Sequence, residues 1–287
     1  MRLAAALLAA FLLCALSRGA AAGTLEYRLD DEYATKGRGR DALENPVGIA
    51  LWGRDILCVA DKAKDRVARF EQSGKWLENV EKADGERTAE LEAPTSVAFD
   101  KRGRLWVCDG GNDRILVYGP EGKLQRVLGR RGYRKGDLLG PTDIAIGGDG
   151  RVYVADTGNK RIQVFRQDGV LLDVWEHEMG QNRSWIDRPA VLAYYPGVED
   201  VLLVADEGGS KLFKVDLRGR LDEVFDLTAL VQSEVRVRDL AVDPTMDRIF
   251  VCDAAGNRIL AIGWKGDLLT EVPMPAGATA SAVGVNW

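Results

Sequence analysis

Histidine is almost absent from this chain, which has one, His177, in 287 residues, together with four cysteines. Catalytic zinc is usually held by three protein ligands, often including several histidines, so one histidine argues against a zinc centre. The sequence also shows no Ser-His-Asp set, no CxxC pair and no phosphate-binding loop after a strand. The common signatures of hydrolytic, redox and nucleotide-binding enzymes are therefore missing.

An excess of basic residues is also lacking. The chain has 39 Lys and Arg against 44 Asp and Glu, a formal charge of −5 at pH 7. Nucleic-acid binding requires a basic footprint, so this balance argues against nucleic acid as a partner. One local exception, RVLGRRGYRK over residues 126–135, contains Arg130, Arg131 and Arg134. It is interpreted as a solvated loop or, alternatively, as a surface for an anionic ligand or partner.

Long apolar runs occur only at the N-terminus. Residues 1–22 combine a basic start at Arg2, an apolar run over residues 3–16 and three alanines at 20–22, the pattern of a cleaved signal peptide. The run is shorter than the roughly 20 residues of a membrane span, and an uncleaved anchor is the alternative. We expect an exported protein, secreted or periplasmic or lumenal, whose mature domain over residues 23–287 has no membrane span.

The dominant feature that is present is a repeat of about 48 residues. An aspartate after a short apolar run recurs with gaps of 48, 47, 50 and 47 residues, and a proline opens the first four units. The repeated aspartates are Asp61, Asp109, Asp156, Asp206 and Asp253. A fixed period of this length indicates a repeat architecture such as a solenoid or a propeller.

The third unit shows the internal structure of one repeat. Residues 143–146, 152–155, 161–165 and 170–175 are predicted strands, and Asp168 and Gly169 form a hairpin turn in which glycine supplies positive φ at low cost. Four short strands with tight turns and no helical periodicity are typical of one β-propeller blade. The chain is therefore predicted to be all-β.

The other units align with the third residue by residue. They span residues 46–80, 94–128, 141–175, 189–225 and 237–272, and residues 280–287 match the first strand of a sixth unit. In all five complete units the aspartate is followed five residues later by Arg or Lys. These basic residues are Arg66, Arg114, Arg161, Lys211 and Arg258.

This pattern resembles the NHL repeat. The segment VYVADTGNKRIQVF at residues 152–165 carries the family signature, as do LWVCDGGNDRILVY and IFVCDAAGNRILAI. The resemblance covers residues 25–287 and implies a β-propeller, usually with six blades. It implies no single activity, because NHL propellers include protein-binding, RNA-binding, sensor and scaffold modules. A minority are enzymes, such as the peptidyl-amidoglycolate lyases, which place histidines on a channel metal that this chain does not match.

The repeated aspartate and its basic partner are interpreted as structural residues. Five copies that point in five directions cannot converge on one substrate, and aspartate readily bonds the backbone of its own turn. We expect each aspartate to cap the turn between the second and third strands and to lie near its basic partner. The alternative is a ring of five carboxylates around a site.

One position in the first strands, which line the channel of a propeller, varies between units. It holds Gly48, Ser96, Asp143, Val191, Asp239 and Ala282. Asp143 and Asp239 are its charged members, and together they are candidates to hold calcium at the channel mouth, although two carboxylates are few for that ion. The alternative is that both cap backbone groups. No other cofactor is expected.

Trp185, in the linker before the fourth unit, is a candidate surface anchor for a partner. Tryptophan supplies much of the binding energy at protein interfaces. The alternative is that Trp185 packs under its own loop.

The cysteines that remain after residue 22 lie in predicted second strands. Cys108 and Cys252 fill a slot that alanine fills in other units, which indicates a small packed position. They sit three units apart, too far for a bridge. We expect Cys58, Cys108 and Cys252 to be free, buried thiols.

The two ends of the chain are expected to share a sixth blade. Residues 24–30 resemble a fourth strand and residues 280–286 a first strand, while the middle strands of that blade are missing. The predicted fold is therefore a propeller with five complete four-stranded blades and a partial sixth. An open sheet edge favours aggregation, so a full-length chain should cover it.

These observations favour an exported propeller that acts as a binding or scaffold module and holds a protein, peptide or glycan with loops on one face. The alternative is a propeller enzyme with a channel metal, similar to the amidoglycolate lyases or to lactonases. The single histidine disfavours that alternative, and no catalytic residue is assigned.

Overall fold

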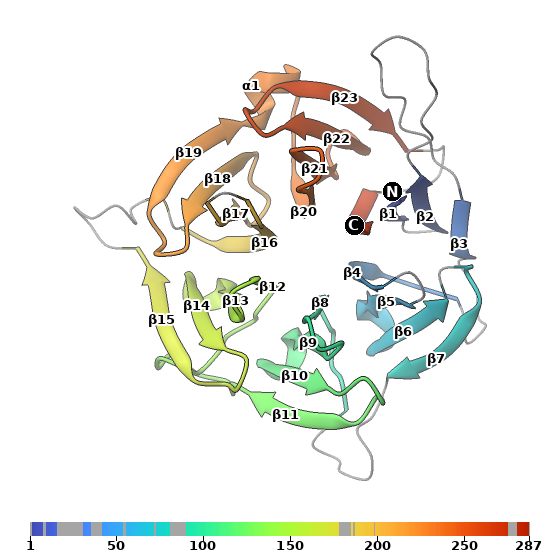
Figure 1. Ribbon diagram of the computed structural model, residues 1–287, viewed down its shortest axis with the longest axis vertical. Helices are drawn as coiled ribbons and strands as arrows, with labels where there is room; N and C mark the ends of the chain where they lie inside the picture. Colours follow the sequence, from blue (N-terminus) through green and yellow to red (C-terminus); the bar gives the residue numbers. More distant parts are fainter. Residues whose placement is uncertain are drawn as a thin grey trace.

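The computed structural model describes residues 2–7, 10–15, 31–35, 42–53, 56–71, 73–80, 90–177, 185, 187–197, 199–274 and 280–286. Its strands form four-stranded antiparallel sheets arranged around a central axis (Figure 1). Five of these sheets are propeller blades, each built from one repeat, with the first strand of the repeat nearest the axis. The predicted all-β propeller with five four-stranded blades is confirmed.

The strand bounds follow the repeat closely. Blade 1 contains β4 (Pro46–Trp52), β5 (Ile56–Asp61), β6 (Arg66–Glu71) and β7 (Trp76–Val80). Blade 2 contains β8 (Ser96–Phe99), β9 (Leu105–Asp109), β10 (Arg114–Tyr118) and β11 (Leu124–Leu128). Blade 3 contains β12 (Asp143–Ile146), β13 (Arg151–Asp156), β14 (Arg161–Arg166) and β15 (Leu171–Glu176). Blade 4 contains β16 (Pro189–Tyr195), β17 (Val201–Asp206), β18 (Lys211–Asp216) and β19 (Leu221–Asp226), and blade 5 contains β20 (Val237–Asp243), β21 (Arg248–Asp253), β22 (Arg258–Gly263) and β23 (Leu268–Pro273).

Helical segments are short. One-turn 3-10 helices follow the repeat aspartates of the first three blades: η1 (Lys62–Lys64), η3 (Gly110–Asn112) and η4 (Thr157–Asn159). The α-helix α1 (Leu227–Val231) follows β19. No helix in the described ranges has the length and apolar character needed to span a bilayer.

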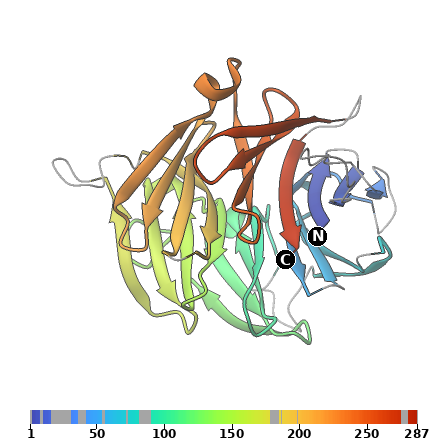
Figure 2. The same ribbon diagram turned by 45° about the horizontal axis from the view of Figure 1, so that its top comes forward.

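The two ends of the chain meet in a further sheet, which we call the closing sheet. Its order is β24 (Ala280–Asn286), β1 (Arg2–Leu7), β2 (Ala10–Ala15) and β3 (Asp31–Thr35). β24 lies nearest the axis, between β20 and β4 (Figures 1 and 2). The expected partial sixth blade is not confirmed, because β1 and β2 occupy the middle positions that we expected to be missing. The fourth strand expected at residues 24–30 lies outside the described residues.

The residues of β1 and β2 belong to the segment that resembles a signal peptide. Arg2 pairs with Ala15 across the β1–β2 hairpin and with Asn286 across the β1–β24 pair. Composition cannot separate the two interpretations, because a short continuous apolar run suits a buried strand as well as a targeting segment. A chain that loses residues 1–22 by cleavage therefore cannot form β1 and β2.

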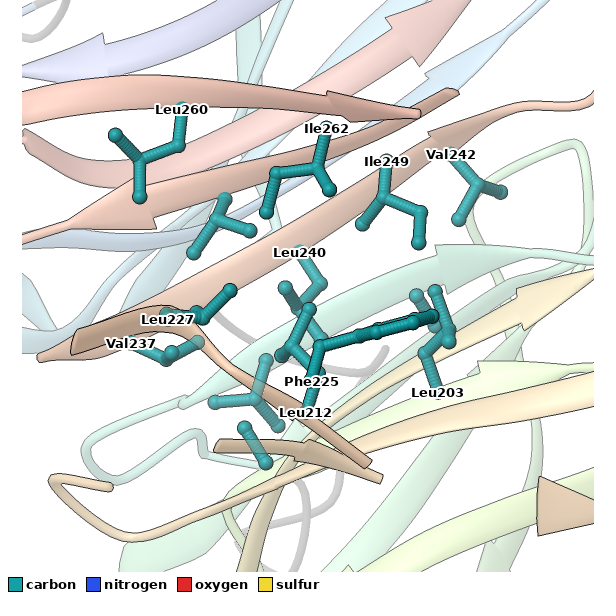
Figure 3. Packing of buried hydrophobic residues seen from close by; sticks show 14 of the residues in the cluster. Leu203, Leu212, Phe225, Leu227, Val237, Leu240, Val242, Ile249, Leu260 and Ile262 are labelled. Atoms are coloured by element: carbon teal, nitrogen blue, oxygen red, sulfur yellow. The ribbon is translucent and has the colours of Figure 1, made fainter. Parts of the chain in front are cut away.

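The core lies between neighbouring blades. Figure 3 shows the contact between blades 4 and 5, where Phe225, Leu212 and Leu203 face Leu240 and Ile249. Similar clusters of buried side chains join the other described blades. Each repeat therefore buries its apolar face only by stacking on its neighbours, which is the general requirement of repeat architectures.

The three thiols are buried and free, as expected. Cys58 lies in β5, Cys108 in β9 and Cys252 in β21. Burial raises the pKa of Cys58 to about 12, and it moves the pKa values of Cys108 and Cys252 upward as well. All three are inert packing residues, because the thiolate is the reactive form.

Candidate functional site

A cavity of about 410 Å³ lies on the ring axis at the end of the blades where the repeat aspartates lie. Its wall includes Lys62, Glu207 and Ala254, each of which directly follows a repeat aspartate. We call this opening the mouth. The first residues of β4, β8, β12, β16 and β20, residues of β24 and a few loop residues complete the wall, as the position of these strands around the axis requires.

The variable position of the repeats lies in this wall. Gly48, Ser96, Asp143, Val191 and Asp239 all line the cavity. Glycine is required at the first of these positions because β4 and β8 approach closely there: a Cβ atom on Gly48 would lie 2.9 Å from Cα of Ser96. The side chains that differ between blades therefore converge on one space.

Asp143 joins three blades through hydrogen bonds. Its Oδ1 accepts from the hydroxyl of Ser96 at 2.6 Å and from the backbone N–H of Ile144 at 2.7 Å. Its Oδ2 accepts from the backbone N–H of Leu192 in blade 4 at 2.6 Å. Burial nevertheless raises the pKa of Asp143 to about 6, because these bonds only partly offset the loss of water.

Asp239 makes the corresponding contacts between blade 5 and the closing sheet. Its Oδ1 accepts from the backbone N–H of Leu240 at 2.9 Å, and its Oδ2 accepts from that of Val283 at 2.7 Å. Burial and, second, the negative charge of Asp143 raise the pKa of Asp239 well above its usual value. Asp143 accepts hydrogen bonds from one more donor than Asp239, so its charged form is the better stabilised of the two. The backbone-capping alternative describes both geometries.

The rim of the mouth carries opposite charge to its floor. Arg238 and Lys62 are exposed at the cavity wall. Within the described residues, Arg238 has no recorded hydrogen bond or ion pair. Glu207 is neutralised by an ion pair with Arg188 at 2.5 Å. The mouth therefore has the basic side chains of Arg238 and Lys62 at its rim and the carboxyl groups of Asp143 and Asp239 in its wall.

The opposite end of the channel is apolar. A cavity of about 210 Å³ there is lined by residues that include Leu51, Phe99, Ile146, Tyr194 and Val242. It contains no charged side chain. Among the described residues, the charged side chains on the axis therefore lie at the mouth.

The basic segment at residues 129–138 rises from the same end of blades 2 and 3 as the mouth. Arg130, Arg131 and Arg134 are exposed, and Tyr133 is 78% exposed, the highest value among the large apolar side chains described. Arg130 pairs with Asp137 at 2.9 Å. Exposed arginines beside an exposed tyrosine fit the alternative that this segment is a contact surface.

The backbone of this segment is fixed by a repeat residue. The guanidinium of Arg161 donates to the carbonyl oxygens of Tyr133 at 3.2 Å, Arg134 at 2.8 Å and Asp137 at 2.8 Å. Nε of the same Arg161 lies 2.7 Å from Oδ2 of buried Asp156. The Asp156–Arg161 pair thus holds the backbone of this segment in place.

The repeat aspartates bond a second segment in addition to the turn that we expected them to cap. Each accepts a backbone N–H from the linker that leads into its own blade. The donors are Asn45 to Asp61 at 2.8 Å, Glu92 to Asp109 at 2.7 Å, Leu139 to Asp156 at 2.7 Å, Arg188 to Asp206 at 3.2 Å and Arg236 to Asp253 at 2.9 Å. Three of them also bond their own following turn: Asp109 accepts from Nδ2 of Asn112 at 2.9 Å, Asp156 from Nδ2 of Asn159 at 2.8 Å, and Asp253 from the backbone N–H of Ala255 at 3.0 Å. The linker passes over the strand end, so its N–H groups are the nearest buried donors to satisfy.

Four of the five expected ion pairs are present among the described residues. Arg66, Arg114, Arg161 and Arg258 lie 3.2, 2.8, 2.7 and 2.9 Å from the carboxylates of Asp61, Asp109, Asp156 and Asp253. Lys211 is exposed and makes no such pair with Asp206. Without a cation, burial raises the pKa of Asp206.

Trp185 does not serve as a surface anchor. It is 9% exposed, its indole N–H donates to the carbonyl oxygen of Gly219 at 3.3 Å, and its ring lies 5.4 Å from that of Phe213. The alternative, that it packs under its own loop, describes its position.

His177 is exposed after β15 and is not among the residues that line the mouth. Within the described ranges, no three His, Cys, Asp or Glu side chains lie close enough together to hold a metal ion. The described lining of the mouth contains the carboxyl groups of Asp143, Asp239 and Glu207 and the hydroxyls of two serines and two threonines, with no histidine.

Sequence reasoning missed part of this site. Lys62 and Arg238 were not singled out, although Arg238 directly precedes the variable position and Lys62 directly follows a repeat aspartate. A comparison of the neighbours of that position across the five units would have found Arg238.

An NHL repeat is present at residues 138–165, which match the family model for that repeat. This segment includes the whole of β13 and η4 and the pair Asp156 and Arg161. A search of curated proteins gives no significant match to the sequence.

The fold is shared with solved β-propellers. The nidogen/laminin complex superposes with a TM-score of 0.75 at 16% identity, over 99% of this chain and 97% of that chain. Streptogramin B lyase gives 0.57 at 16% identity, over 81% and 70%. A catalytically inactive virginiamycin B lyase from Staphylococcus aureus, with quinupristin, gives 0.59 at 14% identity, over 93% and 78%. Similarity at these identities establishes the propeller fold alone.

Proposed function

We propose that this chain is an exported NHL-repeat propeller that acts as a binding module and takes its ligand or partner at the mouth of the central cavity. The observation that carries the proposal is the position of the side chains that differ between repeats. Ser96, Asp143 and Asp239 converge on one cavity, whereas the Asp–Arg pairs that the repeats share bond to the linkers between blades.

The chemistry of the mouth favours a peptide or glycan, either free or displayed by a partner protein. Concave sites with a few converging polar groups are the usual binding places of proteins. Arg238 and Lys62 suit carboxylate or sulfate groups at the rim, and the carboxyl groups of Asp143 and Asp239 suit hydroxyl or amine donors below. The loop at residues 129–138 extends the same face for a larger partner.

Export is supported by the pattern of residues 1–22. The intact mass of the protein recovered outside the cytoplasm tests it. A mass equal to residues 23–287 supports export with cleavage, a mass that retains residues 1–22 supports the uncleaved anchor, and absence of the protein from that fraction contradicts export.

The binding role is tested by exchanging rim charges. The double variant Lys62→Glu with Arg238→Glu should lose capture of ligands from the extracellular fraction, and its melting temperature should stay unchanged because both side chains are exposed. Arg102→Glu, an equally exposed arginine at the opposite end of blade 2, is the matched control. Equal capture by the rim variant and the control would sink the proposal.

A propeller enzyme is the second candidate, and it draws support from the fold that the chain shares with two lyases. The described lining offers a metal the carboxyl groups of Asp143, Asp239 and Glu207, and His177 is not part of it. Metal analysis of protein purified without chelators tests this candidate. A stoichiometric transition metal that disappears in the double variant Asp143→Asn with Asp239→Asn would favour the enzyme.

A further inference from the structure

A second cavity lies between blades 1 and 2, at the strand ends away from the repeat aspartates. It has a volume of about 230 Å³, and its wall includes Trp52, Arg69, Phe99, Tyr118 and Pro120. The rings of Trp52 and Phe99 are 5.8 Å apart. This cavity is separate from the axial site and shares only Phe99 with the lining of the apolar channel end.

The hydroxyl of Tyr118 is buried in this region without a hydrogen-bond partner. Tyr118 is 0% exposed. A buried polar atom without a partner is unfavourable and rare in folded proteins, so it calls for an explanation. The other units place Phe70, Phe165, Val215 or Ile262 at this position, so the fold itself does not require the hydroxyl.

The equivalent place between blades 4 and 5 is filled by the protein's own indole. The ring of Trp264 stacks on that of Tyr195 with centroids 3.8 Å apart, and the Nζ atom of Lys214 lies 4.6 Å from the Trp264 ring. Stacking and cation–π attraction both favour this sandwich.

The repeat alignment maps these three residues onto the wall of the empty cavity. Tyr195 and Trp52 both stand two residues after the small residue of the first strand. Lys214 and Arg69 both stand three residues after the basic residue of the repeat. The position of the indole is taken in blade 2 by Pro120, in a hairpin turn of the same form, Gly-X-X-Gly. Proline is too small to fill the space between Trp52 and Arg69, so this space stays empty.

The match extends to the carboxylate beside the cation. Arg69 is directly opposite Glu78 on the neighbouring strand and forms an ion pair with it. Lys214 is directly opposite Glu223 and lies 3.5 Å from its carboxylate. In blade 4 this ion pair coexists with the contact between the ammonium and the indole, so the pair with Glu78 leaves Arg69 able to cover a ring.

We propose that the cavity between blades 1 and 2 binds a planar aromatic ring with a hydrogen-bonding edge, an indole or a phenol. Trp52 would stack on one face of the ring and Arg69 would cover the other, as Tyr195 and Lys214 do for Trp264. The edge group would pair with the hydroxyl of Tyr118. The ring belongs either to a small aromatic molecule or to an exposed Trp or Tyr side chain of a partner.

Isothermal titration calorimetry with indole as the probe tests this assignment on the whole protein. The wild type should bind one indole. Pro120→Trp supplies the missing indole from the chain itself, so it should abolish indole binding and raise the melting temperature. Arg69→Met should weaken binding by about tenfold, the effect of losing one cation–π contact.

The matched controls use the same chemical changes elsewhere. Tyr118→Phe should weaken indole binding without lowering the melting temperature, whereas Tyr153→Phe, which removes another buried hydroxyl without a partner, should leave binding unchanged. Trp264→Ala should open the equivalent site in blades 4 and 5, lower the melting temperature and add a second indole, whose binding restores part of the loss. Buried cavities of this kind bind apolar rings.

Further results distinguish a small aromatic molecule from a partner side chain, and others would overturn the proposal. Tighter binding of a short tryptophan-containing peptide than of indole indicates a partner side chain, and the reverse indicates a small molecule. Absence of indole binding to the wild type overturns the proposal, as does binding that Pro120→Trp, Arg69→Met and Tyr118→Phe all leave unchanged.

Discussion

Asp239 accepts the backbone N–H of Val283 at 2.7 Å, just as Asp143 accepts that of Leu192 at 2.6 Å. Each carboxyl group therefore fastens the first strand of its own blade to the first strand of the next. The two side chains that sequence analysis assigned to ligand binding also hold the ring together at its axis. Changes in their charge should register in stability as well as in binding.

Stability should fall as pH rises through the range in which these two groups ionise. Their pKa values are raised in the folded protein, to about 6 for Asp143 and well above the usual 3.8 for Asp239, so the folded state binds more protons than the unfolded chain above pH 3.8. The free energy of unfolding decreases with pH wherever the folded state binds more protons. The contribution is fully present below about pH 4 and is lost as pH passes 6.

Urea denaturation between pH 4 and pH 8, for wild type and for Asp143→Asn with Asp239→Asn, measures this contribution. The slope of stability against pH should be flatter in the double variant. Parallel curves for the two proteins would show that these carboxyl groups ionise normally.

Removal of Asp156 should be far more harmful than removal of Asp206. Asp156→Ala leaves the guanidinium of buried Arg161 unpaired, and breaking a buried ion pair from one side costs ~3–5 kcal/mol. Asp206→Ala removes no ion pair and should cost about 1 kcal/mol. Chemical denaturation of both variants checks the difference. Ligand capture per folded molecule should be unchanged in each, and its loss at an unaltered melting temperature would show that the repeat aspartates act in binding.

Millimolar calcium should raise the melting temperature. Two carboxyl groups whose charges repel each other at the mouth favour a bound cation, and the hydroxyl of Ser96 and water would complete its oxygen ligands. The rise should be larger at pH 8 than at pH 6, because calcium competes with the proton on Asp239. Asp143→Asn with Asp239→Asn should remove the rise, and a wild-type melting curve that calcium does not move would count against the site.

Cys58, Cys108 and Cys252 should not react with a thiol reagent at pH 8 in the folded protein. Their burial raises their pKa values and keeps the thiolate form scarce. All three should react after unfolding in guanidinium chloride. Rapid modification under native conditions would show that the second strands open to solvent.

The architecture could be predicted from the sequence because repetition reveals it. A period near 48 residues with four short strands in each unit has one common physical solution, and the strands of blade 3 were predicted to within a residue at each end. The burial of Cys108 and Cys252 could be predicted because alanine takes their position in other units.

The site could be predicted only in part, for reasons that lie in three-dimensional contacts. The variable position was found because it differs between units, but the donor to each carboxylate is a backbone N–H of another blade. Trp185 resembled a surface residue in sequence, yet Phe213 and Gly219 of blade 4 bury it. The cavity between blades 1 and 2 could not be predicted, because its wall combines residues of two repeats. An alignment of the repeats shows which positions correspond but not which side chains meet at the interface between blades.

The closing sheet can form only after synthesis of the chain is nearly complete, because it pairs the first strand with the last. Arg2 finds its partner Asn286 only after nearly the whole chain has been translated, which at cellular rates takes roughly 15–60 s. During that time the apolar N-terminal segment has no β24 to pair with. Under the export that we propose, this longest-range contact would act as a delay, and the secretion apparatus would have the first opportunity to use the residues that otherwise become β1 and β2.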